Sequence, residues 1–322
     1  MAQEEGKDWY NYPLYTDPYI RRLHKEVDFV LKKVEKAVYH VDDFSHFDSM
    51  HYCTHQWLKE FLDTTFSGRS FKAMEFCSGA GSTSRYITAR YPVTITSLDF
   101  TEGLNEVHRR INKLCGINTT TVVQGDATNF DTAGFSVDEN CDLIFSMQSF
   151  LHIENRAGLY RMANKVLKVG GKFYFEDFTT QSPIAENEEE IAACNKLRFC
   201  SRPITSLNCQ LLEAAGFQVE NYIQRTREWS EYVYWRAEHA LEQKDYIIRE
   251  HGEEVFVTRY NNAIWNTTKL YHDLGLNLGE VKAKYPLLTA EVGEAFLQQW
   301  TQDAPQKYGG SYIVATKVRS VA

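Results

Sequence analysis

The stretch KAMEFCSGAGSTSRYIT, Lys72 to Thr88, decides the fold of this chain. It predicts a short apolar strand over 73–77, a glycine turn, and the first turns of a helix. Gly79 and Gly81 permit the sharp reversal and let backbone N–H groups approach a ligand with no Cβ in the way. A pyrophosphate-binding fingerprint would place a third glycine where Ser84 stands. A ligand with a ribose and no pyrophosphate therefore suits this turn better.

A second apolar run, VTITSLDF, closes on an acid. Asp99 lies 18 positions after Gly81, close to the ~20-residue spacing at which a dinucleotide-type fold places a carboxylate on ribose hydroxyls. Helical patterns alternate with further apolar runs, and strands are expected at about 93–99, 119–124, 141–147, 171–177 and 217–223. This βαβ rhythm predicts an α/β fold with a Rossmann-like sheet.

Polar or small residues follow several of the predicted strands. In an open parallel sheet, ligands bind outside the carboxyl ends of the strands, beside the point where the strand order reverses. We therefore expect these residues to converge on one crevice: Gly79, Gly81, Asp99, Asp126, Met147 and Gln148.

The pieces EFCSGAG, LDF, QGDATNF, SMQSFLHI and LKVGGKFYFEDF resemble the class I S-adenosylmethionine-dependent methyltransferases over about residues 71–224. The last two pieces are most similar to the N-methyltransferases that act on glycine, sarcosine, dimethylglycine and phosphoethanolamine. The resemblance implies a seven-stranded sheet. It also implies S-adenosylmethionine as cofactor, S-adenosylhomocysteine as product, and a small-molecule substrate.

The same resemblance implies roles for residues around the cofactor. Asp99 would accept hydrogen bonds from the two ribose hydroxyls, and Phe100 would lie against the adenine. Asp126 and Ala127 would meet the amino edge of the adenine. For Glu75, two interpretations stay open: contact with the methionine part of the cofactor, or a carboxylate satisfied by nearby backbone N–H groups.

The regions outside the sheet read as helices, at 17–38 and 49–62 before it and between 225 and 306 after it. We expect three parts, with a cofactor-binding domain formed by 71–224 and 307–322. Residues 1–70 would form an N-terminal helical lid, or a platform that covers one sheet edge. Residues 225–306 would form a helical cap on the substrate side, inserted before the last strand.

Candidate residues for the chemistry come from the strand ends and the lid. The donor already carries an activated methyl group, so the protein mainly has to aim a nucleophile at it. An amine nucleophile needs a free lone pair, and His152 in SFLHI is placed to take or relay its proton. The alternative is a structural histidine at a helix start. The resemblance to the phosphoethanolamine enzymes pairs this histidine with a lid tyrosine, here Tyr15 in LYTD.

Candidate substrate contacts are less sharply defined. Tyr12 and His51 are expected to reach inward from the lid. Arg198 or Arg202 would anchor a carboxylate or phosphate, unless each is a surface arginine. Tyr234 stands in an aromatic-rich part of the cap and would face a cationic product, or would belong to the core.

Composition excludes several classes of function. A formal net charge of -8 argues against binding to a nucleic-acid backbone. No long apolar run suggests a membrane span, and MAQEEGKDWYNYP does not read as a secretory signal. The 7 scattered cysteines indicate a reducing, cytoplasmic location. The histidines at 40, 46, 51 and 55 lack a HExxH arrangement, so no metal is expected. Whether the chain forms a homodimer stays open.

The leading hypothesis is therefore an S-adenosylmethionine-dependent methyltransferase acting on the nitrogen of a small polar or zwitterionic amine. The alternative within the fold is an S- or O-methyltransferase on a small carboxylate or lipid-like acceptor. A catalytically silent cofactor-binding protein is disfavoured by the glycine turn with Asp99 and Asp126. An NAD-dependent oxidoreductase is disfavoured by Ser84.

Overall fold

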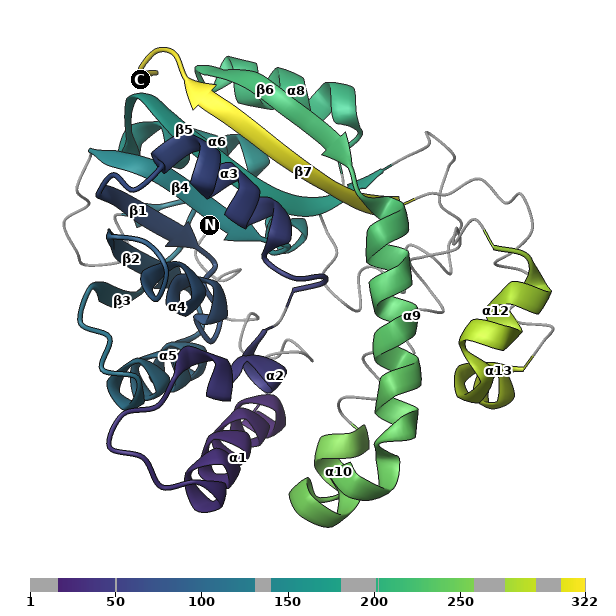
Figure 1. Ribbon diagram of the computed structural model, residues 1–322. Coiled ribbons are helices and arrows are strands. Elements are labelled where there is room, and N and C mark those ends of the chain that lie inside the picture. The colour runs from purple at the N-terminus through teal and green to yellow at the C-terminus, as the bar shows by residue number, and fades with distance from the viewer. Residues whose placement is uncertain are drawn as a thin grey trace, which may run out of the picture.

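The computed structural model describes residues 17–49, 51–130, 140–180, 201, 203–257, 276–293 and 308–321. Its centre is a seven-stranded sheet with the order β3-β2-β1-β4-β5-β7-β6 (Figure 1). All neighbouring pairs are parallel except those of β7, which runs antiparallel to β5 and β6. The strands are β1 (Phe71–Phe76), β2 (Val93–Asp99), β3 (Thr120–Gln124), β4 (Cys141–Met147), β5 (Leu167–Thr180), β6 (Phe217–Gln224) and β7 (Tyr308–Lys317). The predicted α/β fold with its Rossmann-like sheet is confirmed.

Helices bury both faces of this sheet. The apolar stripe of α3 (Gln56–Phe66) and residues of α4 (Ser82–Thr88) pack on one face, while α6 (Arg156–Val166) and α8 (Thr205–Ala214) pack on the other. Strand residues alternate between the two cores, as a pleated strand requires. In β5, for example, Phe173 contributes to one core and Tyr174 to the other. Burial of this apolar surface is what stabilises the sheet.

The N-terminal helices differ from the predicted ones. α1 (Asp17–Lys33) ends short of residue 38, because Val34 and Val38 are exposed and nothing buries a continued apolar stripe. The helix expected from residue 49 begins only at Gln56, since Cys53 has a left-handed backbone with φ of 60°. Two short turns precede it, η2 (Val41–Asp43) and α2 (Ser45–Asp48). α1 packs on α5 (Glu102–Leu114) rather than on the sheet.

The chain leaves the sheet after β6 as a long helix. α9 (Thr226–Glu242) runs away from the sheet edge and turns into α10 (Lys244–His251) (Figure 1). The helices α12 (Leu278–Lys284) and α13 (Pro286–Val292) pack against α9 through the cluster around Tyr234 and Tyr285. Within the region 225–306, the helices expected from the sequence after α10 cover 255–275 and 291–304, most of which lies outside the described residues, whereas α12 and most of α13 fall between these two ranges.

α10 meets α1 at the end of the molecule far from the β6 edge (Figure 1). His251 Nδ1 lies 2.9 Å from the buried carboxylate of Glu26, and Lys25 Nζ lies 2.7 Å from Glu254. The N-terminal region and the segment after β6 therefore join each other. None of the described helices is both long and apolar enough to cross a membrane.

Candidate active site

A cavity of about 1550 Å³ lies at the carboxyl ends of the central strands. We call its two walls the strand-end half and the helical half. The strand-end half comprises the lining residues between 75 and 86, 98 and 101, 125 and 128, and 147 and 155. The helical half comprises lining residues of α1, of the segment 41–55, and of α9 and α10. A pocket for one drug-sized ligand has about 300–1,000 Å³, so this cavity has room for two reactants.

The glycine turn joins β1 to α4 and uses left-handed backbone at both glycines. Gly79 has φ of 54° and Gly81 has φ of 78°. At Gly81 a Cβ would stand only 2.1 Å from Nε2 of His108, a buried histidine of α5. Gly79 lines the cavity, whereas Gly81 is not among the lining residues and caps the N-terminus of α4. The turn thus needs glycine at 81 for conformation and for space.

Asp99 ends β2 and faces the same turn. Its two carboxylate oxygens accept from the backbone N–H groups of Gly79, at 2.7 Å, and Thr101, at 2.8 Å. Burial raises the pKa of Asp99, and these two hydrogen bonds oppose that effect. Each carboxylate oxygen keeps a further lone pair for a hydroxyl donor. Asp99 is therefore fixed in place and still able to accept from a ligand.

The residues after β2 and β3 complete this wall. Asp126 accepts from the backbone N–H and the hydroxyl of Thr128, at 2.7 and 2.8 Å. Ala127 is buried, and Phe100 exposes 37% of its surface, enough for an apolar contact. All three predicted residues line the cavity together with Asp99.

Glu75 lies under the turn and is almost fully buried. Its carboxyl group accepts from the hydroxyl of Ser84, which also pairs with the hydroxyl of Ser97 at 2.6 Å. Burial raises the pKa of Glu75 to about 8, with the Ser84 hydrogen bond opposing. Glu75 lines the cavity, but side-chain hydroxyls satisfy it rather than the backbone N–H groups that the sequence suggested. Ser84, which stands in the place of the third glycine, supplies one of these hydroxyls.

Gln148, just after β4, binds the N-terminal region. Its side-chain oxygen accepts from the backbone N–H of Tyr52 at 2.8 Å, and its amide nitrogen donates to the carbonyl of Tyr52 at 3.2 Å. Its own backbone N–H donates to the carbonyl of Glu176 at 2.7 Å. Met147 and Gln148 both line the cavity. The amide of Gln148 is thus engaged with Tyr52, a use that its prediction as a cofactor contact did not include.

A buried ion pair joins the two halves. Arg85 of α4 donates to the carboxylate of Asp48 at 2.5 Å and to the carbonyl of Ala80 at 2.6 Å, and both charged side chains are at most 2% exposed. Burial raises the pKa of Asp48, and the charge of Arg85 opposes it. Asp48 ends α2, so this pair fixes the segment 41–55 against the glycine turn.

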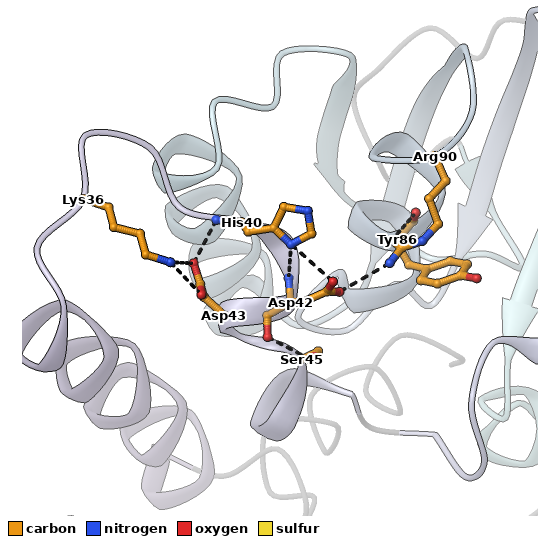
Figure 2. A network of polar contacts seen from close by, with 7 residues as sticks. All are labelled: Lys36, His40, Asp42, Asp43, Ser45, Tyr86 and Arg90. Carbon is orange, nitrogen blue, oxygen red and sulfur yellow. Dashed lines mark hydrogen bonds and ion pairs between the residues drawn. The ribbon is translucent and has the colours of Figure 1, made fainter.

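A more exposed network supports the same segment (Figure 2). Asp43 accepts from Lys36 and from the backbone N–H of His40. The side chain of His40 accepts from a backbone N–H of η2 in return, and the two residues form a capping box at the start of η2. Asp42 reaches Arg90 at 3.5 Å, and the Arg90 guanidinium lies 4.0 Å above the ring of Tyr86 (Figure 2). Exposed ion pairs contribute little stability. Here they connect η2 to Lys36 on one side and to Arg90 on the other.

Two neutral histidines line the cavity from this segment. Burial lowers the pKa of His51 to about 4 and that of His55 to about 2. His51 Nδ1 lies 3.3 Å from the Ser49 hydroxyl, while its buried Nε2 has no hydrogen-bond partner among the described residues. His51 is therefore available to a ligand, as its prediction as a substrate contact requires.

His152 ends the short helix η4 (Phe150–His152) that follows β4. It is partly exposed and lines the cavity between Leu151 and Ile153. The described structure thus places His152 on the same wall as Asp99 and Met147. Its suggested partner Tyr15 lies outside the described residues, as does Tyr12.

Three further predicted substrate contacts are not found in the cavity. Arg198 and Arg202 lie outside the described residues. Tyr234 is fully buried, with its ring 5.5 Å from that of Tyr285, in the cluster between α9 and α13. It points away from the cavity because it lies on the opposite side of α9 from the residues that line it.

Sequence reasoning missed the face of α9 that does line the cavity. The residues of this face recur three and four apart, which a helix brings onto one side. They are Tyr232, Trp235, Arg236, His239 and Ala240, and Gln243 follows directly after the helix. The sequence does carry a signal for this face, namely polar and aromatic residues spaced three and four apart within the predicted helix. Aromatic content alone does not identify the face.

The strand-end half fits S-adenosylmethionine on the geometry of its own residues. The carboxylate of Asp99 is held by amides and keeps acceptor capacity for two ribose hydroxyls. The exposed ring of Phe100 and the buried Ala127 offer apolar contact for an adenine. Groups of three or more metal-ligating side chains were not found among the described residues.

Comparisons with known proteins point to one class. A family described as "Methyltransferase domain" matches residues 74–175. A sarcosine/dimethylglycine N-methyltransferase of Halorhodospira halochloris is 24% identical over 191 residues, 59% of this chain and 67% of the relative. A phosphoethanolamine N-methyltransferase of Triticum aestivum is 25% identical over 69% of this chain and 43% of the relative.

A solved structure shows the same fold. It is a phosphoethanolamine N-methyltransferase 2 of Haemonchus contortus in complex with phosphomonomethylethanolamine and S-adenosylhomocysteine, with a TM-score of 0.64 and 13% identity. The alignment covers 95% of this chain and 58% of that one. This chain thus spans about half the length of the phosphoethanolamine enzymes that it matches.

The fold, the glycine turn with Asp99, and these comparisons agree. The chain carries a methyltransferase domain over residues 74–175 and has the fold of the class I S-adenosylmethionine-dependent methyltransferases that its sequence motifs resemble. Within that class, the similar proteins described here are N-methyltransferases of small amines.

Proposed function

We propose that this methyltransferase acts on the nitrogen of a small polar or zwitterionic amine. The observation that carries the proposal is the position of His152 on the cavity wall that also presents Asp99 and the glycine turn. The similar proteins named for sarcosine, dimethylglycine and phosphoethanolamine support the same class of acceptor.

The chemistry assigned to the chain's own residues is modest. S-adenosylmethionine supplies an activated methyl group when bound. The cavity walls hold the acceptor nitrogen in line with that group, which replaces much of the entropy cost of a bimolecular encounter. His152 takes the proton of the ammonium, because an ordinary imidazole titrates near neutrality. His51 is too weak a base for this task, with its pKa of about 4, and instead accepts a hydrogen bond.

Residues 1–70 and 225–306 are proposed to close over the reactants as lid and cap. Support comes from the segment 41–55 and from α9 and α10, which line the cavity. The contacts of α1 with α10 connect the two. α3 has a different part within 1–70, because it packs on the sheet. Exclusion of water would strengthen the electrostatic contacts within the site.

The test is transfer from isotope-labelled S-adenosylmethionine to a panel of amines, amino acids, phosphobases, thioethers and carboxylates. We expect only compounds with an amino group, among them amino acids and phosphobases, to gain mass. Replacing His152→Asn should lower kcat by about 10²–10⁴-fold, the usual contribution of a general base, while affinity for S-adenosylhomocysteine stays unchanged. His24→Asn, at a histidine of α1 that does not line the cavity and contacts Arg110, serves as the control.

Labelled thioethers or carboxylates without labelled amines would support the S- or O-methyltransferase alternative. A normal rate for His152→Asn would remove its role as base. No transfer to any acceptor would leave the amine proposal without support.

A further inference from the structure

We propose that Arg236 forms an anion-binding subsite in the helical half of the cavity and holds a carboxylate or phosphate of the methyl acceptor. The assignment of the anion to a zwitterionic amine rests on the proposed function. It assigns the anion to α9 rather than to Arg198 or Arg202, which lie outside the described residues.

The arginines of the cavity differ in their partners. Three described arginines line it: Arg22, Arg85 and Arg236. Arg85 pairs with buried Asp48 at 2.5 Å, and Arg22 lies 3.7 Å from buried Glu26. Within the described chain, no carboxylate lies in ion-pair distance of Arg236. The Arg236 side chain is partly exposed, but two of its donor nitrogens are buried, and a buried donor is costly unless it is paired. Arg236 is thus the cavity arginine whose charge is left for a ligand.

The unused donors of Arg236 share one edge. Nε and Nη2 are both buried, and neither has a hydrogen-bond partner among the described residues. These two atoms point their N–H groups in the same direction, in the plane of the guanidinium. A carboxylate or a phosphate accepts two parallel hydrogen bonds from such an edge. The pattern of unsatisfied atoms therefore matches a planar or tetrahedral oxyanion.

Aromatic rings fix the guanidinium without using these donors. Its central carbon lies 5.1 Å from the ring centre of Tyr52 and 5.8 Å from that of Tyr232. Cation–π contacts engage the face of a guanidinium and leave its N–H edges available. Burial raises the pKa of Tyr52 to about 12, against the opposing charge of Arg236. A hydrogen bond between the two side chains opposes the rise as well, and the Tyr52 hydroxyl is protonated at neutral pH beside the guanidinium.

Tyr52 also ties the subsite to the strand ends. Both backbone groups of Tyr52 bind the side chain of Gln148, directly after Met147 at the end of β4. Its ring packs edge-on against Trp229, at 5.6 Å, and Phe178, at 5.9 Å. The acceptor's anion would thus be held in a fixed relation to the strand-end half, which is what in-line transfer requires.

A binding experiment tests the subsite without any methyl transfer. The full chain, saturated with S-adenosylhomocysteine, is titrated with sodium phosphate or sodium acetate, and its Tm is compared with sodium chloride at equal ionic strength. A ligand that binds only the folded state raises Tm. We expect phosphate or acetate to raise the Tm of the wild type, and Arg236→Gln to abolish that rise.

Two variants control this experiment. Arg227→Gln removes an exposed arginine of the same helix, away from the cavity, and should keep the full response. Arg236→Lys retains a point charge but loses the two-pronged edge, so it should keep only part of the response. It replaces Arg236→Gln as the test if that variant folds poorly. An equal response in wild type and Arg236→Gln would overturn the proposal.

Kinetics with matched acceptors separates the anion from the amine. Glycine carries a carboxylate and phosphoethanolamine a phosphate, while ethanolamine carries neither. Arg236→Gln should raise KM for whichever anionic amine is the substrate by about 100-fold, as expected when one partner of a hydrogen-bonded charge pair is removed. KM for ethanolamine should change less than about twofold. An equal loss for anionic and neutral amines would show a packing role and contradict the proposal.

The two proposals fail in different ways. If no amine is methylated by the wild type but the phosphate or acetate response disappears in Arg236→Gln, the anion subsite stands and N-methylation falls. If amines are methylated and Arg236→Gln behaves as wild type in both experiments, N-methylation stands and the anion subsite falls.

Discussion

The two halves of the cavity are built in different ways. In the strand-end half, a carboxylate is held by backbone groups at the end of its own strand or a neighbouring one, as Asp99 is by Gly79 and Thr101. In the helical half, residues are held by side chains far away in the chain, as Tyr52 is held by Gln148 of the strand-end half over 96 positions. The first half follows from sheet topology, which the class shares. The second depends on individual side chains and can vary with the acceptor.

The largest effect is expected at the joint between the halves. Arg85→Met leaves Asp48 as a buried carboxylate without its partner, and loss of one partner of a buried pair costs about 3–5 kcal/mol. The free energy of unfolding in urea should fall by that amount. A double variant that adds Asp48→Leu should recover much of the loss. Equal stability of single and double variants would show that the ion pair does not couple the halves.

The next effect isolates the strand-end half. Asp99→Ala removes the acceptor of two buried N–H groups and of the proposed ribose contacts. Affinity for S-adenosylhomocysteine, measured by calorimetry, should fall by at least about 100-fold, the scale of two charge-assisted hydrogen bonds. Asp63→Asn, at an exposed acid outside the cavity, should bind normally. Binding within threefold of wild type would remove Asp99 from the cofactor site.

An effect that depends on pH is expected at Glu75. Burial raises its pKa from 4.5 to about 8, so between these values the folded state keeps a proton that the unfolded state releases. This group therefore makes the protein less stable as pH rises through that window, by up to about 1.4 kcal/mol per pH unit. Glu75→Gln cannot titrate and should gain on the wild type from pH 5 to pH 8 in urea unfolding. A constant difference across this range would contradict the buried, protonated state.

The smallest effect separates the halves most cleanly. Gln148→Leu leaves the N–H and carbonyl of Tyr52 without their partners, a local cost of about 1–3 kcal/mol. We expect KM for the acceptor to rise by about tenfold while affinity for S-adenosylhomocysteine changes less than twofold. The opposite result, weaker cofactor binding with normal KM, would make Gln148 a cofactor contact, as the sequence suggested.

The same division explains what the sequence could predict. Strands, glycine turn and strand-end acids have local signals, because each residue follows its own apolar run; Asp99 and Asp126 were found in this way. The irregular backbone at Cys53, which delays α3, has no periodic signal. The position of Arg236 needed the face of α9 to be chosen, and that choice depends on the contact of α9 with α13 on its other side. Local periodicity gives an amphipathic helix but not the direction in which its polar face turns.

The contact of α1 with α10 has a consequence for the nascent chain. Lys25 and Glu254 are separated by 229 positions, so α1 leaves the ribosome long before α10 is made. Its apolar side can dock on α5 early, but Glu26 lacks His251 until α10 has been made. α1 therefore completes its contacts only after α10 has been made, and a chain that stops before α10 lacks both this partner and β7, the strand that lies between β5 and β6.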